Sequence, residues 1–336
     1  MELAVTGIQP TGQVHLGNYL GMIEPTLRLA AEVPTLCFVA DHHALISVRD
    51  PDAVRRTTRE VAAAWIAFGL DPTSTVLYRQ SDVPELCELT WILSCLTAKG
   101  LLNRAHAYKA AVQRNVEEGR DADAGVNAGL YLYPVLMAAD ILGMDAALVP
   151  VGADQLQHIE VARDVASAFN AAHGEVLRLP RPLVDDRVAT LPGTDGAKMS
   201  KSRGNTIPVL AGEDRLRSAV MRIVTDSRSA GAPRDPSTDP VFAIHRLVLS
   251  PDAAEEMRVR LNAGGVGYGQ SKRELAEALA NRFAEPRARF AELLADPVEV
   301  ERILERGAEV ARERAIAVLG RVRDAVGLLP AAVREG

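Results

Sequence analysis

The chain has 336 residues, 48% of them hydrophobic and 24% charged, and a formal net charge of −6. This length predicts two domains, each able to bury its own core. The negative net charge argues against the strongly basic surface that coats DNA, although RNA binding needs only a local basic patch. No apolar run approaches the roughly 18 residues of a membrane span. Residues 1–5 also lack the basic segment of a signal peptide.

Cysteine usage is sparse. Cys37, Cys87 and Cys95 are too few and too scattered for a disulfide framework or a C-x-x-C metal site. We expect all three to be buried, reduced thiols. These features predict a cytoplasmic protein that holds no tightly bound metal.

Short apolar runs alternate with helical patterns through residue 180. The apolar runs predict strands buried on both faces, at residues 3–5, 36–40, 75–78 and 146–151. This alternation predicts an α/β fold, with a Rossmann-like, doubly wound parallel sheet. In such sheets ligands bind beyond the carboxyl ends of the strands.

Helix start signals lie between these runs. Asp50 and Pro51 predict the start of a helix that ends at Gly69. Ser81 or Asp82 predicts the start of the next helix.

The pattern changes beyond residue 206. Helical periodicity dominates there, at residues 215–224, 241–249, 253–262 and 272–323. We therefore predict an α/β domain over residues 1–206 and an α-helical domain over residues 207–336. Packing of the last helices of the second domain back on the first is compatible with this division.

Polar side chains follow three of the predicted strands directly. They are His15, Asp41–His43 and Gly152–Gln155. Since the carboxyl ends of parallel strands meet at one edge of the sheet, we expect a site to form there.

The first motif is a glycine- and proline-containing turn, residues 7–12, followed by His15-Leu16-Gly17-Asn18. A glycine there removes the side chain that would block close approach of a base or a phosphate. The following helix N-terminus adds a partial positive charge. Taken alone, the motif could be an ordinary turn before a helix.

The second motif is Lys198-Met199-Ser200-Lys201-Ser202, flanked by Gly196 and Gly204. Two lysines three residues apart on a polar loop suit the clamping of a polyphosphate better than the filling of a core. In this order, the two motifs resemble the two signatures of class I aminoacyl-tRNA synthetases.

Longer stretches resemble the bacterial tryptophanyl-tRNA synthetases, and the likeness covers essentially the whole chain. These stretches are residues 7–21, 41–44, 130–141, 149–160, 193–202 and 265–279. The resemblance implies that tryptophan reacts with Mg²⁺-bound ATP to give an adenylate and pyrophosphate, and that the amino acid then passes to tRNA(Trp). It also implies a homodimer whose helical domains read the anticodon, with neither DNA nor a membrane as a partner.

The resemblance further implies roles for individual residues. The catalytic residues it implies are His15, Asn18, Lys198 and Lys201. The ATP-binding residues it implies are Gln9, Pro10, Thr11, Gly17, Asn18, Gly152, Ala153, Asp154, Val188, Lys198, Met199, Ser200, Lys201 and Ser202. The tryptophan-binding residues it implies are Gly7, His43, Tyr133, Met137, Asp140, Val149, Val151 and Gln155.

Asp140 is the residue that we predict to determine amino-acid specificity. Tyr133, Met137, Asp140 and Ile141 share one face of a helix expected over residues 130–142. A carboxylate on an apolar face is costly unless it has a partner. An ion pair with an arginine is one explanation. The resemblance implies instead that Asp140 accepts the indole N–H.

Met137 separates two neighbouring families. Tyrosyl-tRNA synthetases resemble this chain but typically have glutamine at this position, and a thioether suits a larger apolar ring better. A tyrosine–tRNA ligase is therefore the nearest alternative, and a non-catalytic synthetase paralogue that acts as a binding module is a further one. For His43, considered alone, an ordinary core histidine is the more common case.

Two points stay open from sequence. Ala111 stands where some relatives have a phosphate-contacting lysine, and Lys109 or Arg114 are the candidates to replace it. In the helical domain, the basic residues that could contact tRNA could equally pair with Glu285, Glu292 and Asp296. These basic residues are Arg282, Arg287 and Arg289.

Overall fold

The computed structural model describes residues 2–152, 155–184, 191–227 and 231–328. A five-stranded parallel sheet forms its centre, in the order β3-β2-β1-β4-β5. The strands are β1 (Ala4–Ile8), β2 (Thr35–Val39), β3 (Val76–Arg79), β4 (Leu148–Val151) and β5 (Arg181–Val184). The predicted doubly wound α/β sheet is confirmed, and its strand order reverses between β1 and β4.

The strand β5 is absent from the sequence prediction. It lies at the edge of the sheet, and three of its four residues are exposed. Pro182 within it is tolerated because an edge strand need not donate every ladder hydrogen bond. An exposed edge strand does not show the apolar run that marks a strand buried on both faces.

Helices cover both faces of the sheet. Along β2, Leu36 and Phe38 belong to one apolar cluster while Cys37 and Val39 belong to another, and all four are buried. The helices and helical turns of this part are α1 (Leu16–Asn18), a π-helix (Tyr19–Ile23), α2 (Glu24–Ala30), α3 (Asp41–Ala44), α4 (Pro51–Ala67), a 3-10 turn (Gln80–Asp82), α5 (Glu85–Leu96), α6 (Lys99–Leu102), α7 (His106–Glu117), α8 (Ala128–Leu142), α9 (Leu156–His173) and a second 3-10 turn (Lys201–Arg203).

The predicted start of α4 is confirmed, since the Asp50 side chain accepts a hydrogen bond from the Asp52 N–H. The predicted start at Ser81 or Asp82 is wrong, because α5 begins at Glu85. The Ser81 hydroxyl instead donates to Asp41, and the Asp82 carboxylate binds Arg79. Neither side chain is therefore available to cap a helix.

The expectation that all three cysteines are buried is wrong for the two on α5. Cys37 is buried in β2, but Cys87 and Cys95 are exposed. They share the outer face of α5 with Trp91, four residues from each, which is 71% exposed. The apolar face of the same helix is made by other residues, Leu86, Leu89, Ile92 and Leu93.

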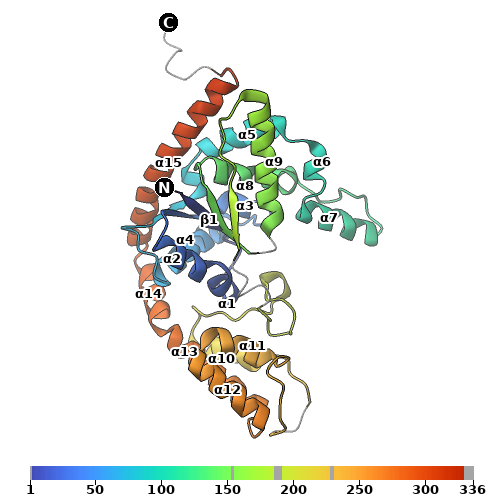
Figure 1. The fold of residues 1–336 in the computed structure, drawn as a ribbon, viewed down its shortest axis with the longest axis vertical. Coiled ribbons are helices and arrows are strands. Elements are labelled where there is room, and N and C mark those ends of the chain that lie inside the picture. Colours follow the sequence, from blue (N-terminus) through green and yellow to red (C-terminus); the bar gives the residue numbers. More distant parts are fainter. Residues whose placement is uncertain (1, 153–154, 185–190, 228–230, 329–336) are drawn as a thin grey trace.

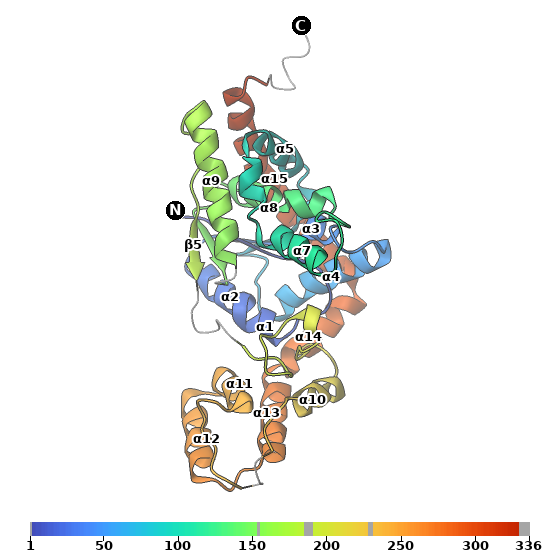
Figure 2. The ribbon, with the colours of Figure 1, turned by 90° about the vertical axis from the view of Figure 1, so that its right-hand side faces the viewer.

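Beyond residue 206, the described residues form six helices. They are α10 (Glu213–Met221), α11 (Pro240–Val248), α12 (Pro251–Ala263), α13 (Tyr268–Arg282), α14 (Ala284–Ala295) and α15 (Pro297–Ala325). Figures 1 and 2 show α10–α13 together at one end of the molecule, while α14 and α15 run back along the body that holds the sheet. The single helical stretch expected at 272–323 is three helices, and Asp296 caps α15 as Asp50 caps α4.

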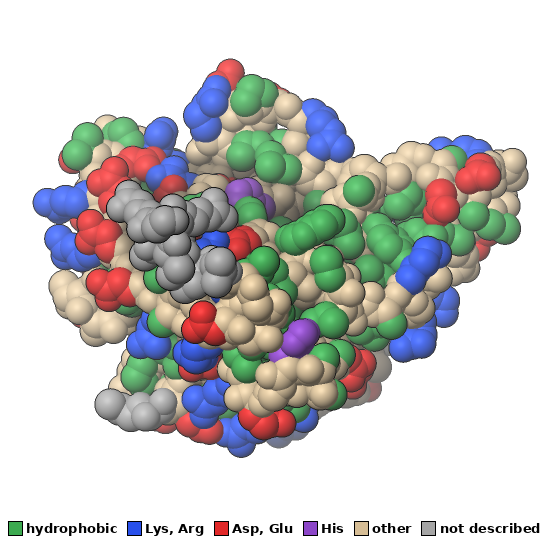
Figure 3. Space-filling view, turned by 90° about the horizontal axis from the view of Figure 1, so that it is seen from above, with side chains coloured by type: hydrophobic (Ala, Val, Ile, Leu, Met, Phe, Trp, Pro, Cys, Tyr) green, Lys and Arg blue, Asp and Glu red, His purple; other side chains and the backbone are tan. Residues whose placement is uncertain are grey.

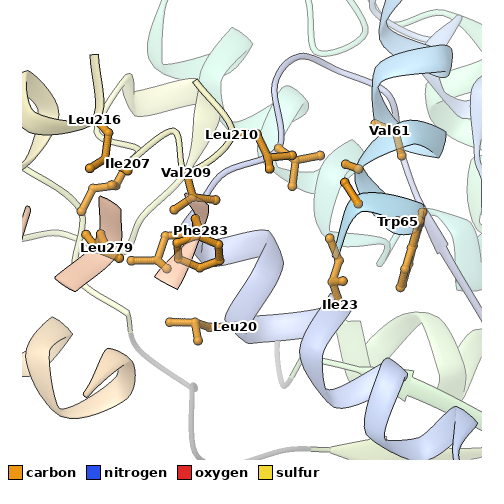
Figure 4. Close-up of a cluster of buried hydrophobic side chains, with 14 of the residues drawn as sticks. Leu20, Ile23, Val61, Trp65, Ile207, Val209, Leu210, Leu216, Leu279 and Phe283 are labelled. Atoms are coloured by element: carbon orange, nitrogen blue, oxygen red, sulfur yellow. The ribbon is translucent and has the colours of Figure 1, made fainter. Parts of the chain in front are cut away.

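One apolar cluster crosses the expected domain boundary. It joins Ile23 and Trp65 of the sheet-bearing part to Leu279 and Phe283 of the helical part, as Figure 4 shows. Ile207, Val209 and Leu210, just beyond the boundary, are buried in the same cluster. The division at residue 206 stays a prediction.

The helix α15 lies against the edge strand β3. Gly307 packs so closely that a Cβ built on it would lie 1.9 Å from the Leu77 carbonyl oxygen. Ion pairs join the helix to the same side of the body, among them Glu301 with Arg79 at 2.8 Å. Across the part of the chain that the structure describes, every helix is too short or too polar to traverse a lipid bilayer.

Candidate active site

A cavity of about 800 Å³ opens beside the carboxyl ends of β1 and β4, where the strand order reverses. Residues from both motifs and from α8 line it, although they are far apart in the sequence. Of the predicted site residues, those that line the cavity are Gly7, Gln9, Thr11, His15, Gly17, Asn18, His43, Tyr133, Met137, Asp140, Val149, Val151, Gly152, Gln155, Lys198, Met199, Ser200 and Lys201.

The remaining predicted residues are placed differently. Ala153, Asp154 and Val188 lie outside the described residues. Pro10 is buried, and its carbonyl oxygen accepts a hydrogen bond from the Thr57 hydroxyl at 2.8 Å. Ser202 lies in the 3-10 turn Lys201–Arg203.

His15 caps the helical segment that begins with α1. Its Nδ1 accepts a hydrogen bond from the Gly17 N–H at 3.1 Å, and its own N–H donates to Asn18 Oδ1 at 3.2 Å. Burial, and secondarily the charge of Lys201, lowers the His15 pKa from 6.5 to about 4. The imidazole is therefore neutral near pH 7. Because Nδ1 accepts, the ring proton lies on Nε2, which can donate a hydrogen bond.

A side chain at Gly17 would be crowded. A Cβ there would lie 3.0 Å from the His15 ring and 3.4 Å from the Met199 sulfur. Met199 belongs to the second motif, so the two motifs are in contact at this point. The absence of a side chain at position 17 lets the lysine loop approach the helix start.

The two motifs also meet through hydrogen bonds. Lys201 Nζ donates to the Gly12 carbonyl oxygen at 2.9 Å. The Leu16 N–H donates to the Ile207 carbonyl oxygen at 2.9 Å. Burial lowers the pKa of Lys201, while the nearby Glu60 carboxylate raises it. The expected convergence of two remote segments on one cavity is present.

Asp140 lies at the apolar end of the cavity and is fully buried. The Gln80 amide donates to both of its carboxylate oxygens, at 2.7 and 2.9 Å. His43 Nε2 lies 3.1 Å from Oδ2, and the ring nitrogen donates there because a carboxylate only accepts. The partners of Asp140 are therefore an amide and an imidazole, and within the described residues no arginine forms the ion pair considered from sequence.

Gln80 is a site residue that was not predicted from the sequence. Its Oε1 accepts the His42 N–H at 3.1 Å, which fixes the amide so that its Nε2 donor faces Asp140. Gln80 follows β3 directly and is fully buried. The rule that selected His15 and His43, a polar residue just after a buried strand, would have found it.

Gly7 is required by Phe38. A Cβ on Gly7 would lie 2.4–2.6 Å from the Phe38 ring, which itself stacks on Tyr78 with ring centroids 5.5 Å apart. The space that Gly7 leaves is filled by a side chain of the protein. Gly7 also lines the cavity, so the close approach of a base or a phosphate expected from sequence stays a prediction.

Other contacts hold the cavity wall in place. The Gln9 amide donates to the His43 carbonyl oxygen at 2.8 Å, which ties the first motif to the segment after β2. The Tyr133 hydroxyl lies 2.7 Å from His158 Nε2. Tyr133 and Met137 thus face the cavity from α8, beside Asp140.

The helix α7, with Ala111, Lys109 and Arg114, contributes no described residue to the cavity lining. Lys109 and Arg114 are both exposed. Within the described residues, the lysines and histidines that line the cavity are His15, His43, Lys198 and Lys201.

The three arginines of the helical part have partners. Arg282 pairs with Glu24 at 2.8 Å, Arg287 with Glu213 at 3.5 Å, and Arg289 with Glu299 at 2.6 Å and Glu292 at 3.3 Å. Of the acids named from sequence, Glu292 alone is among these partners. On the face shown in Figure 3, basic and acidic side chains are interspersed.

Comparison with known proteins gives a consistent result. Residues 3–284 match the family model of class I tRNA synthetases (W and Y). The chain is 48% identical over 329 residues to the tryptophan–tRNA ligase of Neisseria meningitidis, covering 97% of this chain and 98% of that protein. It is 49% identical over 329 residues to that of Pseudomonas aeruginosa, covering 96% of this chain and 73% of that protein.

A solved structure agrees with these relatives. The tryptophanyl-tRNA synthetase of Campylobacter jejuni, complexed with ADP and tryptophan, superposes with a TM-score of 0.87 at 40% identity, over 97% of this chain and 100% of that one. The chain therefore belongs to the class I aminoacyl-tRNA synthetases and, within them, to the bacterial tryptophan–tRNA ligases.

Proposed function

We propose that this enzyme joins tryptophan to tRNA(Trp) in two steps at the cavity described above. A tryptophan carboxylate oxygen attacks the α-phosphorus of ATP, and pyrophosphate leaves with the bonding electrons. A ribose hydroxyl of the tRNA then attacks the carbonyl carbon of the adenylate, loses its proton, and AMP leaves. Mg²⁺ enters with ATP as part of the substrate. Because the product is used in translation, we place the enzyme in the cytoplasm.

The observation that carries the proposal is the pairing of two unlike ends in one cavity. Lys198 and Lys201 line one end, and the buried carboxylate of Asp140 lies among Met137, Tyr133 and Phe38 at the other. A polyphosphate suits the first end, and an apolar ring with one N–H donor suits the second. Both substrates of the first step then fit side by side.

The residues have distinct proposed roles. His15, as a neutral donor, and Asn18, Lys198 and Lys201 stabilise charge that develops on the phosphates. Asp140 accepts the indole N–H while Gln80 and His43 hold it in place. The other proposed contacts are those named from sequence. On the resemblance alone, we place Ala153 and Asp154 at the ribose of ATP and Val188 beside its adenine.

The test is amino-acid-dependent exchange of pyrophosphate into ATP, run with each of the twenty amino acids. We expect exchange with tryptophan alone. Exchange with tyrosine instead would favour the tyrosine–tRNA ligase alternative. Exchange with neither would favour a binding module without catalysis.

The variant Asp140→Ala sharpens this test. We expect it to lose tryptophan-dependent exchange while it still binds ATP, since the phosphate end is untouched. Equal exchange by variant and parent would remove Asp140 from its role. Transfer of labelled tryptophan to tRNA(Trp) tests the second step, and light scattering in solution tests the proposed homodimer.

A further inference from the structure

We propose that Asn205 is a positioning residue for the two cavity lysines, holding the loop of residues 191–205, the lysine loop, in the shape that the reaction needs. This inference rests on the proposed function for the reaction it serves. Asn205 is 2% exposed, and it belongs to neither of the two motifs. It does not line the cavity, so it acts through the residues it holds.

The Asn205 side chain bonds the loop at three points. Its Oδ1 accepts the Ser200 N–H at 2.7 Å. Its Nδ2 donates to the Lys198 carbonyl oxygen at 3.1 Å and to Asp195 Oδ1 at 2.6 Å. Both amide hydrogens and the carbonyl oxygen are thus used, which leaves one orientation for the amide.

Two of these bonds hold the backbone of the second motif, at Lys198 and Ser200. Lys198 and Ser200 lie on either side of Met199, whose own N–H donates to the Leu191 carbonyl oxygen at 2.9 Å. The chain from Lys198 to Lys201 is therefore fixed from two sides. From that position Lys201 Nζ reaches the Gly12 carbonyl oxygen at 2.9 Å.

The loop is shaped around this one side chain. A Cβ on Gly193 would lie 2.3 Å from Asn205 Nδ2 and 2.7 Å from the backbone carbonyl oxygen of Asn205. This backbone oxygen accepts the Thr194 N–H at 2.9 Å. Asp195, the third point, also accepts the Ala197 N–H at 3.0 Å. The hydrogen bond from Asn205 is the first cause of the lowered pKa of Asp195, which keeps this acceptor ionised.

A fixed loop would contribute to catalysis because the lysine charges must meet the phosphates without costly reorganisation. Loss of the Asn205 amide should therefore lower the rate of adenylate formation while tryptophan binding is unchanged. If Asn205 served only stability, its substitution would lower the melting temperature and leave kcat unchanged.

The experiment exchanges the donor and the acceptor between positions 205 and 195. In Asn205→Asp, the new carboxylate still accepts the Ser200 N–H but faces the Asp195 carboxylate and the Lys198 carbonyl oxygen. In the double variant Asn205→Asp with Asp195→Asn, an amide at position 195 can donate to the carboxylate at position 205. The pair is then restored with its roles reversed, while the contact to Lys198 stays lost.

We expect Asn205→Asp to lower kcat of tryptophan-dependent exchange about 10- to 100-fold, with tryptophan KM within about twofold of the parent. The double variant should regain at least about fivefold. Asn205→Ala, which adds no charge, should lose kcat to a similar extent and serves if Asn205→Asp does not fold. An unchanged kcat in the single variants, or no recovery in the double variant, would overturn the proposal.

A matched control is Asn170→Asp. Asn170 is also a buried asparagine that bonds a loop, since its Oδ1 accepts the Leu177 N–H at 2.9 Å and its Nδ2 donates to the Leu177 carbonyl oxygen at 2.7 Å. It does not line the cavity. We expect its substitution to lower the melting temperature with kcat unchanged.

Amide hydrogen exchange gives a readout that does not need activity. In the parent, the Ser200 amide should be protected by Asn205 Oδ1, and Asn205→Ala should remove protection at residues 198–201. Unchanged protection there would contradict the role of Asn205 in the loop. If the parent protein shows this protection but catalyses no pyrophosphate exchange with any amino acid, the result would count against the proposed function alone.

Discussion

Lys201 Nζ donates a hydrogen bond to the carbonyl oxygen of Gly12, 189 positions away in the chain, at 2.9 Å. This contact closes the second motif onto the turn of the first. It also holds the ammonium at the edge of the cavity, where burial disfavours its charge. A phosphate group that replaced the carbonyl oxygen would be the stronger partner, since both groups would then be charged.

The first prediction follows from this exchange of partners. Lys201→Ala should lower kcat of pyrophosphate exchange about 100-fold, as the loss of one preorganised charge contact typically does. Tryptophan KM should stay within about twofold, because the lysine lies away from Asp140. Lys198→Ala should behave alike. Steady-state exchange kinetics measure both constants. A rise in tryptophan KM alone would show that the lysines serve tryptophan binding and not the reaction at the phosphates.

The second prediction concerns Gln80. Gln80→Ala removes two hydrogen bonds from a fully buried carboxylate, at 2.7 and 2.9 Å. Loss of a hydrogen bond to a charged group costs about 1.5–3 kcal/mol of folding stability. The Asp140 carboxylate also loses the group that orients it toward the indole N–H, so tryptophan KM should rise about 10-fold or more. ATP KM should be unchanged.

A suitable control for this variant is Gln157→Ala. The Gln157 amide bonds the His106 N–H and the Arg104 carbonyl oxygen, away from the cavity. It should leave both KM values unchanged. If Gln80→Ala bound tryptophan as the parent does, Asp140 would not depend on this amide.

Much of this site could be predicted because parallel strands bring their carboxyl ends to one edge. His15, His43 and Gly152 each follow a strand, and all three line the cavity. Asp140 could be singled out because a lone carboxylate on an apolar helix face needs a reason. These inferences use only local pattern and a rule of topology.

The partners of these residues could not be predicted in the same way. Gln80 and Asp140 are 60 positions apart, and Asn205 and Asp195 meet only because the loop turns back on itself. Gly7 is a glycine because of the Phe38 ring on the neighbouring strand. Contacts of this kind depend on register and loop shape, which a single sequence does not specify.

The third prediction is a pH dependence of stability. The His15 pKa falls from 6.5 to about 4 on folding. The folded state therefore binds the proton less readily than the unfolded chain, so the stabilisation is present above pH 6.5 and is lost as the pH falls toward 4. Between about pH 7.5 and 5 this one group should cost the parent about 2 kcal/mol.

His15→Asn is the matched control for that measurement. Asparagine also caps helices well but does not titrate. Urea unfolding of both proteins at a series of pH values gives the difference, in which the titration of other groups cancels. Equal pH dependence of the two proteins would show that His15 is protonated as easily when folded as when unfolded.

The last prediction concerns the contact between α15 and β3. Glycine inside a helix normally costs about 0.5–1 kcal/mol relative to alanine, so a Gly→Ala change there is usually stabilising. At Gly307 the sign should reverse. The new Cβ would lie 1.9 Å from the Leu77 carbonyl oxygen and 2.6 Å from its carbon, both of them backbone atoms of a strand in the sheet.

Neither partner can move cheaply. The Leu77 position is paired in register with Cys37 of β2, and Glu301 of α15 is held by Arg79 at 2.8 Å. We expect Gly307→Ala to lower the free energy of unfolding by about 2 kcal/mol or more, as overpacking of a close contact does. Gly320→Ala, on the same helix with no atom within 4 Å of its Cβ position, should instead raise it by about 0.5–1 kcal/mol. Urea midpoints of the two variants decide the matter, and a stabilised Gly307→Ala would mean that α15 does not rest on β3 in solution.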